Sequence, residues 1–128
     1  MDKPRNQAYE WGEQAEELAA DYLRAKGYTV RERRWRYGAS KKEIDIIAQQ
    51  DDTMIFVEVK ARTDSDTDPL EAVDSRKMRF LCFAADAYLN EQEHDYFYRF
   101  DIIGISGTPA DYSLRHIEDA FLPPLMAR

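Results

Sequence analysis

Cysteine, histidine and long apolar runs are all scarce in this chain of 128 residues, which has one cysteine and two histidines. The lone Cys82 excludes a disulfide framework and a zinc site built from several cysteines. No apolar run approaches the roughly 20 residues of a membrane helix, and the polar residues 1–13 lack the apolar core of a signal peptide. We therefore expect a soluble cytoplasmic protein without a membrane partner, in which Cys82 packs in the core.

Net positive charge is also missing, since 25 acidic residues against 18 basic ones give a formal net charge of -7. This argues against a nucleic-acid partner. The charge is uneven, however, because residues 24–42 hold eight basic residues and one acidic residue. Trp35 and Tyr37 lie among these cations, an arrangement typical of nucleic-acid contacts. The segment is either a solvated edge strand with protective charges or a surface that guides a nucleic acid.

The pattern of apolar residues predicts one α/β domain over residues 1–128, with flexible tails at 1–10 and 123–128. A helical connection before the fourth strand allows a parallel strand pair, so we expect a sandwich with a central mixed sheet flanked by helices. Within the basic segment, strand alternation places Arg34 and Arg36 on one face and Arg33 on the other. The predicted elements are a helix at 12–26, strands at 28–37, 43–48 and 54–60, a helix from about 68 to 91 with a break possible at 74–75, and strands at 98–106 and 112–121.

Two segments with charged residues set into apolar strands, residues 43–47 (EIDII) and 56–60 (FVEVK), are predicted to form an antiparallel hairpin. Glu58 and Lys60 share a strand face, and the hairpin brings Asp45 within one register slip of Glu58. Two carboxylates suit a hard divalent cation, and a nearby lysine suits an attacking water or the charge that builds at phosphorus. The alternative is a strand pair with solvated charges, although burial on both faces would make unpaired charges costly.

The Asp-x12-Glu-x-Lys arrangement of Asp45, Glu58 and Lys60 resembles the PD-(D/E)XK nuclease superfamily. The flanking sequence resembles one branch of it, the YraN-like endonucleases related to archaeal Holliday junction resolvases, over nearly the whole chain. The resemblance implies a restriction-endonuclease-like αβββαβ core and a Mg²⁺- or Mn²⁺-dependent endonuclease that acts on nucleic acid. We expect DNA as the substrate, in a branched or single-stranded form, although the sequence itself does not distinguish DNA from RNA or linear from branched substrates. The matching pieces occur in order: Gly12-x-x-Ala-Glu, Tyr22-Leu, Gly27-Tyr, Glu43-Ile-Asp, residues 56–62, Glu71-Ala-Val, Lys77 and Arg99-Phe-Asp.

Three positions depart from that pattern without removing a metal ligand. Ile44 stands where the superfamily has a proline, and Lys42 and Ala15 stand where glycines are usual. These departures affect loop geometry more than chemistry.

The resemblance also implies individual roles. Asp45 and Glu58 would bind the metal, the Val59 carbonyl would complete its shell, and Lys60 would position water or stabilise the transition state. A helix glutamate of the family points toward the metal, which makes Glu16 an auxiliary ligand or base, whereas by itself it is typical of a solvated helix residue. The basic residues expected to contact nucleic acid are Arg34, Arg36, Lys42, Arg62 and Lys77.

Two alternatives stay open. Lys77 interrupts an apolar helical stripe. It either contacts a phosphate at the site or simply extends its ammonium to solvent. The competing hypothesis for the whole protein is a non-catalytic nucleic-acid-binding or assembly protein that has kept the nuclease fold. The sequence also leaves a homodimer open.

Overall fold

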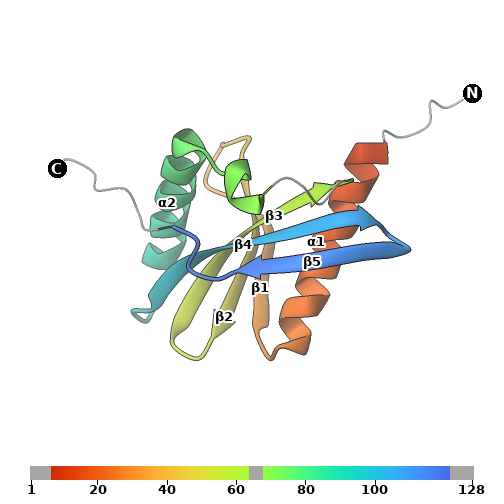
Figure 1. Cartoon of the computed structure of the whole chain (residues 1–128). Helices are drawn as coiled ribbons and strands as arrows, with labels where there is room; N and C mark the ends of the chain where they lie inside the picture. The colour runs from red at the N-terminus through yellow and green to blue at the C-terminus, as the bar shows by residue number, and fades with distance from the viewer. Residues whose placement is uncertain (1–6, 64–67, 122–128) are drawn as a thin grey trace, which may run out of the picture.

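The computed structural model describes residues 7–63 and 68–121 and has one five-stranded sheet between two α-helices (Figure 1). The strand order is β1-β2-β3-β4-β5, with β3 and β4 parallel and the other neighbours antiparallel. This confirms the predicted mixed sheet, the αβββαβ order and a final edge strand. The elements are α1 (Gln7–Ala25), β1 (Thr29–Arg36), β2 (Glu43–Gln50), β3 (Thr53–Arg62), the 3₁₀ helix η1 (Pro69–Ala72), α2 (Ser75–Asn90), β4 (Phe97–Thr108) and β5 (Asp111–Ile117).

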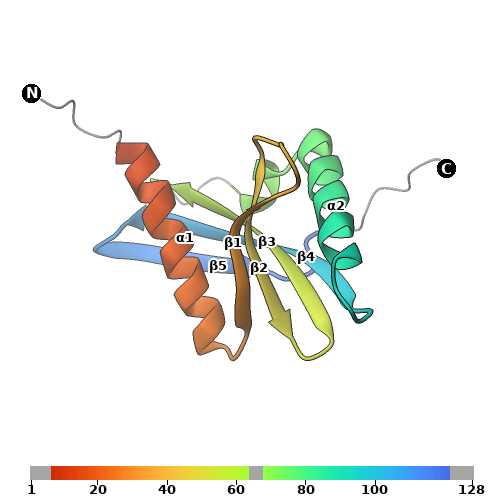
Figure 2. The ribbon, with the colours of Figure 1, turned by 180° about the vertical axis from the view of Figure 1, so that it is seen from behind.

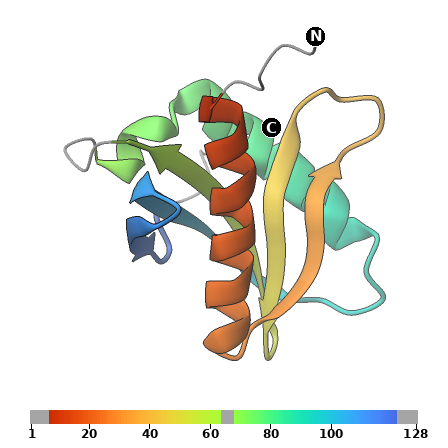
Figure 3. The ribbon, with the colours of Figure 1, turned by 90° about the vertical axis from the view of Figure 1, so that its right-hand side faces the viewer.

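The helices cover opposite faces of the sheet, as Figure 2 and Figure 3 show, so each face has its own hydrophobic core. Alanines on α1 let this helix lie close to β2 and β3, while α2 packs larger side chains against aromatic rings on the other face. Both faces of β2 and β3 are therefore covered, as the apolar character of these strands predicts, and of their charged residues Glu58 is buried while Asp45 and Lys60 are half-buried. The buried helix residues include Trp11, Ala15, Ala19 and Leu23 of α1, and Leu81, Ala84, Ala85 and Tyr88 of α2.

The first helix begins earlier than predicted, at Gln7 rather than at Gly12. Trp11 explains the difference, because its ring is buried and its Nε1–H donates to the Arg62 carbonyl at 3.0 Å, which holds the added turn against β3. Residues 7–10 are thus helical rather than part of the expected tail. Residues 1–6 and the predicted tail at 123–128 lie outside the described residues.

The predicted helix at 68–91 is divided in two. Asp68 caps η1 by accepting a hydrogen bond from Leu70 N–H, and Asp74 caps α2 by accepting one from Lys77 N–H. Val73 between them is extended, with φ -118° and ψ 97°. The break at 74–75 that the sequence left open is therefore present, and the second cap fixes the first turn of α2.

The last strand is shorter than predicted, ending at Ile117 rather than at Phe121. Asp119 has a φ of +51°, which turns the chain out of the sheet. Its N–H donates to Asp101 Oδ1 at 3.0 Å, so the turn is held by the neighbouring strand.

Close packing of η1 on the sheet gives a first prediction. Gly104 of β4 pairs with Lys60, and a Cβ at this position would overlap the Pro69 ring. We expect Gly104→Ala to destabilise the protein by about 1–3 kcal/mol, because η1 must shift. Urea unfolding measures this change.

Gly12→Ala is the matched control. A Cβ at Gly12 meets nothing within 4 Å, so this helix substitution should stabilise the protein by about 0.5–1 kcal/mol. Wild-type stability for Gly104→Ala would contradict the η1 packing.

Candidate active site

The candidate site lies where β2 and β3 diverge. Their register runs from Gln50–Thr53 to Ile46–Val57. Beyond it, Asp45 Oδ2 accepts a hydrogen bond from the Val59 main-chain N–H at 2.8 Å. The carboxylate thus satisfies a strand N–H that the ladder between β2 and β3 does not. Figure 3 shows the two strands spreading apart toward this end, with α1 lying across them.

Side-chain alternation on β2 is interrupted at Asp45. Ile46 belongs to the core under α1, whereas Ile44, two residues earlier, belongs to the core under α2. In a regular strand these two side chains would share a face. The irregularity turns Asp45 toward the main chain of β3 and toward Glu58.

Glu58 is buried on the α2 side of the sheet. Continuing the β2–β3 register places it opposite Asp45, as the sequence predicted within one residue. The residue is 4% exposed, and one carboxylate oxygen forms an ion pair with Lys77 of α2. The other oxygen, Oε2, is buried and has no hydrogen-bond partner among residues 7–63 and 68–121. Because an unpaired buried carboxylate oxygen is costly, this atom suits a cation.

The carboxyl groups of Asp45, Glu58 and Glu16 influence one another's ionisation. Burial, then the charge of Glu58, raises the pKa of Asp45 to about 7. Burial also raises the pKa of Glu58, although the Lys77 ammonium opposes the shift. The pKa of Glu16 is raised by burial and then by Asp45, which places the helix glutamate within electrostatic reach of the pair. Such a group of carboxyls favours a bound cation.

A cavity of about 800 Å³ gathers most of the predicted residues. α1 lies on one side of it and the first turns of α2 on the other, and the loop between β1 and β2 completes the wall. Glu58 does not line the cavity, although its chain neighbours Val59 and Lys60 and its ion-pair partner Lys77 do. The predicted residues that line it are Glu16, Arg34, Lys42, Asp45, Val59, Lys60 and Lys77.

Two predicted nucleic-acid contacts do not line the cavity. Arg36 pairs with Glu43 at 2.8 Å. The Arg62 carbonyl accepts the Trp11 hydrogen bond, and the buried Nε of Arg62 has no partner among the described residues. Arg76 was missed by the sequence interpretation and does line the cavity. Its position beside Lys77 in the first turn of a capped helix was the signal that could have indicated it.

The basic strand β1 corrects one prediction. Arg33, expected on the face opposite Arg34, contacts the same helix: Arg33 pairs with Glu17 at 3.0 Å and Arg34 with Glu16 at 3.4 Å. The cause is Arg34's φ of +52°, which breaks the regular alternation. Arg34 is thereby placed beside the cavity.

The Arg99-Phe-Asp101 motif lies away from the cavity. Asp101 is buried and accepts a hydrogen bond from Arg99 Nε at 3.0 Å, while His116 Nε2 lies 2.7 Å from its other oxygen. Burial acts to raise the pKa of Asp101, but the hydrogen bonds from His116, Arg99 and the Asp119 main chain lower it overall. This motif joins β4, β5 and the turn that follows.

Comparison with known protein families decides the family of the chain. A family model described as uncharacterised protein family UPF0102 matches residues 15–105. The chain belongs to the UPF0102 family. This membership confirms the YraN-like resemblance at the level of the family. Within the described ranges, no helix is both long and apolar enough to cross a membrane.

Relatives within UPF0102 match almost end to end. The chain is 42% identical to a UPF0102 protein of Phocaeicola vulgatus over 117 residues, covering 91% of this chain and 95% of the relative. It is 41% identical to a UPF0102 protein of Bacteroides fragilis, with 89% and 93% covered. It is 40% identical to a UPF0102 protein of Chlorobium chlorochromatii, with 92% and 95% covered.

Proposed function

We propose that this UPF0102 protein is a metal-dependent nuclease that hydrolyses phosphodiester bonds in nucleic acid, in DNA rather than RNA. The supporting observation is the position of Asp45 and Glu58. These two carboxylates lie close together where β2 and β3 separate, beside a cavity that Lys60 lines. The buried Oε2 of Glu58, which has no hydrogen-bond partner within the described part of the chain, is the feature that a solvated strand pair does not explain. A site of this composition suits phosphoryl transfer, in which positioning and charge stabilisation supply most of the catalysis.

Mg²⁺ or Mn²⁺ fits this donor set. Across residues 7–63 and 68–121, no group of three His, Cys, Asp or Glu side chains is arranged to hold a metal. Asp45 and Glu58 with the Val59 carbonyl would instead hold the ion, and Mg²⁺ commonly combines one or two carboxylates with waters and phosphate oxygens. When bound, the ion supplies Lewis acidity and lowers the pKa of water.

The remaining residues have roles that follow from their positions. Lys60 carries an ammonium into the cavity for the attacking water or a phosphate oxygen. The raised pKa makes Glu16 a stronger base than an ordinary glutamate, which suits it to accept a proton from water. Lys42 and Arg34 supply cations for phosphates on either side of the reacting one. Lys77 is paired with Glu58 and so also holds that carboxylate in place.

Cleavage assays test the proposal directly. Single strands, flaps, duplexes and four-way junctions of DNA, together with single-stranded RNA, are incubated with Mg²⁺ or Mn²⁺ and, as a control, with EDTA. The expected result is metal-dependent cleavage of at least one DNA substrate. Nucleic-acid binding without cleavage under any metal would favour the non-catalytic alternative instead.

Lys60→Ala separates chemistry from binding. We expect turnover to fall at least tenfold, which corresponds to about 1.4 kcal/mol of activation free energy, with unchanged metal binding and fold. Lys41→Ala is the matched control, because Lys41 also lines the cavity but lies on the loop after β1. Steady-state cleavage rates measure turnover, and circular dichroism checks that the fold is unchanged. Equal rates for Lys60→Ala and the wild type would mean that Lys60 is only a solvated strand residue.

A further inference from the structure

The cavity has one acidic wall and one basic wall. α1 carries five acidic residues and one basic residue, and Glu13 and Glu16 line the cavity. α2 carries three basic residues and one acidic residue, of which Arg76 and Lys77 line the cavity. A polyanion bound here is repelled along α1 and attracted along α2. The electrostatics therefore direct a bound strand over α2.

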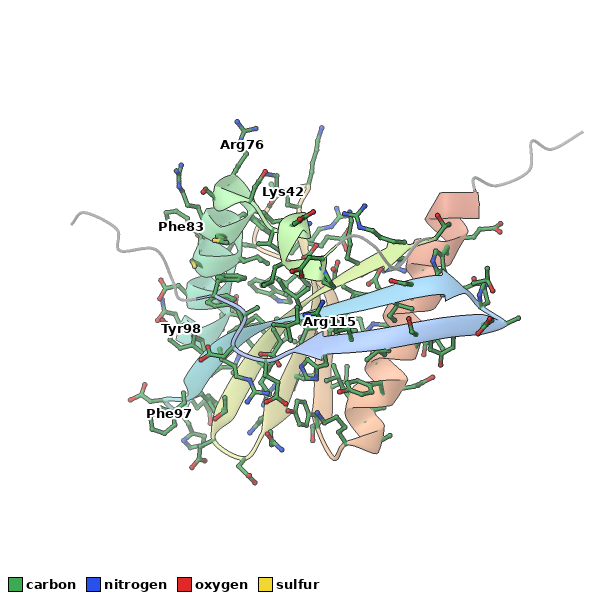
Figure 4. All side chains as sticks on the ribbon, in the orientation of Figure 1. Lys42, Arg76, Phe83, Phe97, Tyr98 and Arg115 are labelled. Carbon is green, nitrogen blue, oxygen red and sulfur yellow. The ribbon has the colours of Figure 1, made fainter. Side chains whose placement is uncertain are left out.

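The loop between β1 and β2 extends the basic wall. Lys42 Nζ lies 5.8 Å from the centre of the Phe80 ring of α2, so the loop reaches the first turns of this helix. In Figure 4 the side chains of Lys42 and Arg76 both project outward at this end of the molecule. On the side of α2 the basic residues Lys42, Arg76 and Lys77 thus outnumber the one acidic residue, the helix cap Asp74.

The outer face of α2 continues from these basic residues. Arg76, Arg79 and Phe83 are exposed and lie on one line, because residues three and four apart share a helix face. Arg76 and Phe83 are separated by about 10 Å along the axis at 1.5 Å per residue. Phe83 is 58% exposed, which is unusual for a phenylalanine on a helix that packs against a sheet.

A further aromatic ring lies beyond Phe83. Tyr98 is 47% exposed near the start of β4, and Figure 4 shows it on the same side of the molecule as Phe83. The Tyr98 ring packs edge to face on Phe100 of the α2-side core at 5.9 Å, so Tyr98 lies on the α2 face of the sheet, whereas its neighbour Phe97 points to the opposite face. Exposed aromatic rings that follow cations are the components of a single-strand binding surface.

We propose that this surface, the α2 track, binds a single-stranded segment of nucleic acid that leads into the cavity. The track consists of Arg76, Arg79, Phe83 and Tyr98. The inference rests on the proposed nuclease function and adds the form of the substrate. About three stacked nucleotides, at 3.4 Å each, span the distance from Arg76 to Phe83. The arginines contact phosphates and the rings stack on bases, which a continuous duplex cannot offer because its bases are already stacked.

The charge at the far end of α2 sets the path of the strand. Asp86 is exposed one turn after Phe83, so its carboxylate repels phosphates along the helix axis. The strand is therefore expected to turn from Phe83 toward Tyr98.

Metal-free binding assays test the track without cleavage. Fluorescence anisotropy in EDTA compares a labelled oligothymidine of about 15 nucleotides with a blunt duplex. Phe83→Ala/Tyr98→Ala is expected to weaken single-strand binding at least fivefold, since stacking contributes strongly per base, and duplex binding less than twofold. Tyr112→Ala is the matched control, because Tyr112 is a 42% exposed aromatic on β5. It should leave both affinities unchanged.

A charge-reversal pair tests the basic part of the track. Arg79→Glu should weaken single-strand binding and flatten its salt dependence, whereas Arg115→Glu changes the net charge equally on exposed β5 and should do neither. If Arg115→Glu weakened single-strand binding more than Arg79→Glu did, the track would be wrong.

The outcomes separate the track from the nuclease proposal. Single-strand affinity unchanged in Phe83→Ala/Tyr98→Ala, with cleavage intact in the wild type, overturns the track alone. No binding and no cleavage of any nucleic acid by the wild type overturns both. If the same variant only converts a dimer to a monomer in light scattering, the aromatic surface is a contact between two copies of the chain, and the track is wrong.

Discussion

Glu58→Gln is expected to lower nucleic-acid cleavage at least a hundredfold and to remove measurable Mg²⁺ or Mn²⁺ binding. The substitution keeps the size of the side chain but replaces a charged oxygen in a set of only two carboxylates. Metal-assisted phosphoryl transfer owes several kcal/mol to the ion, so losing it corresponds to a rate decrease of about a hundredfold or more. Calorimetry measures metal binding and single-turnover cleavage measures the rate on the same preparation.

The control for this prediction is Glu43→Gln. Glu43 lines the same cavity two residues from Asp45, but its carboxylate pairs with Arg36. The variant therefore makes the same change in net charge at the cavity without touching the proposed ligands, and it should bind metal as the wild type does. Calorimetric affinity will be weak even in the wild type, because phosphate oxygens normally complete a magnesium shell of this kind. Wild-type metal binding by Glu58→Gln would remove Glu58 from the site.

The local part of the site could be predicted from the sequence. The hairpin and its two-residue alternation were sufficient to place Glu58 near Asp45 and to set Lys60 on the same strand as Glu58. The helical crossover predicted the parallel pair of β3 and β4, which buries β3 in the middle of the sheet. The hairpin depends on neighbouring residues and the parallel pair on the order of the elements along the chain, and the sequence contains the signals for both.

The remaining parts of the site depend on contacts between distant elements. The ion pair between Lys77 and Glu58 requires the start of α2, which Asp74 fixes by capping at a position the apolar pattern left open. Glu16 reaches the site because α1 crosses the diverging strands, and its sequence surroundings resemble those of any solvated helix glutamate. Arg34 depends on a positive φ that strand periodicity does not reveal. Tertiary packing determines all three positions.

Asp45→Asn is expected to make the metal-free protein more stable at pH 8 than the wild type. The pKa of Asp45 is raised from 3.8 to about 7, first by burial and then by Glu58. The folded protein therefore holds this proton more tightly than the unfolded chain, and wild-type stability falls as pH rises between the two pKa values. Asparagine carries no charge and can still accept the Val59 hydrogen bond. Its advantage should grow by about 2–3 kcal/mol between pH 5 and pH 8, as measured by urea unfolding in EDTA.

Asp101→Asn should give the opposite result and serves as the matched control. Both aspartates lie in the sheet, where Asp101 is buried and Asp45 is half-buried, but the pKa of Asp101 is lowered despite burial, because His116, Arg99 and the Asp119 main chain stabilise its charge. Its contribution to stability is present above its ordinary pKa and is lost as pH falls, so Asp101→Asn should cost about 2 kcal/mol or more at pH 8 and less in acid. A loss of stability at pH 8 in both variants would mean that Asp45 is a structural carboxylate like Asp101. If only Asp45→Asn is more stable than the wild type at pH 8, the charge of Asp45 destabilises the metal-free fold. This is the result expected of a carboxylate whose role is to bind a cation.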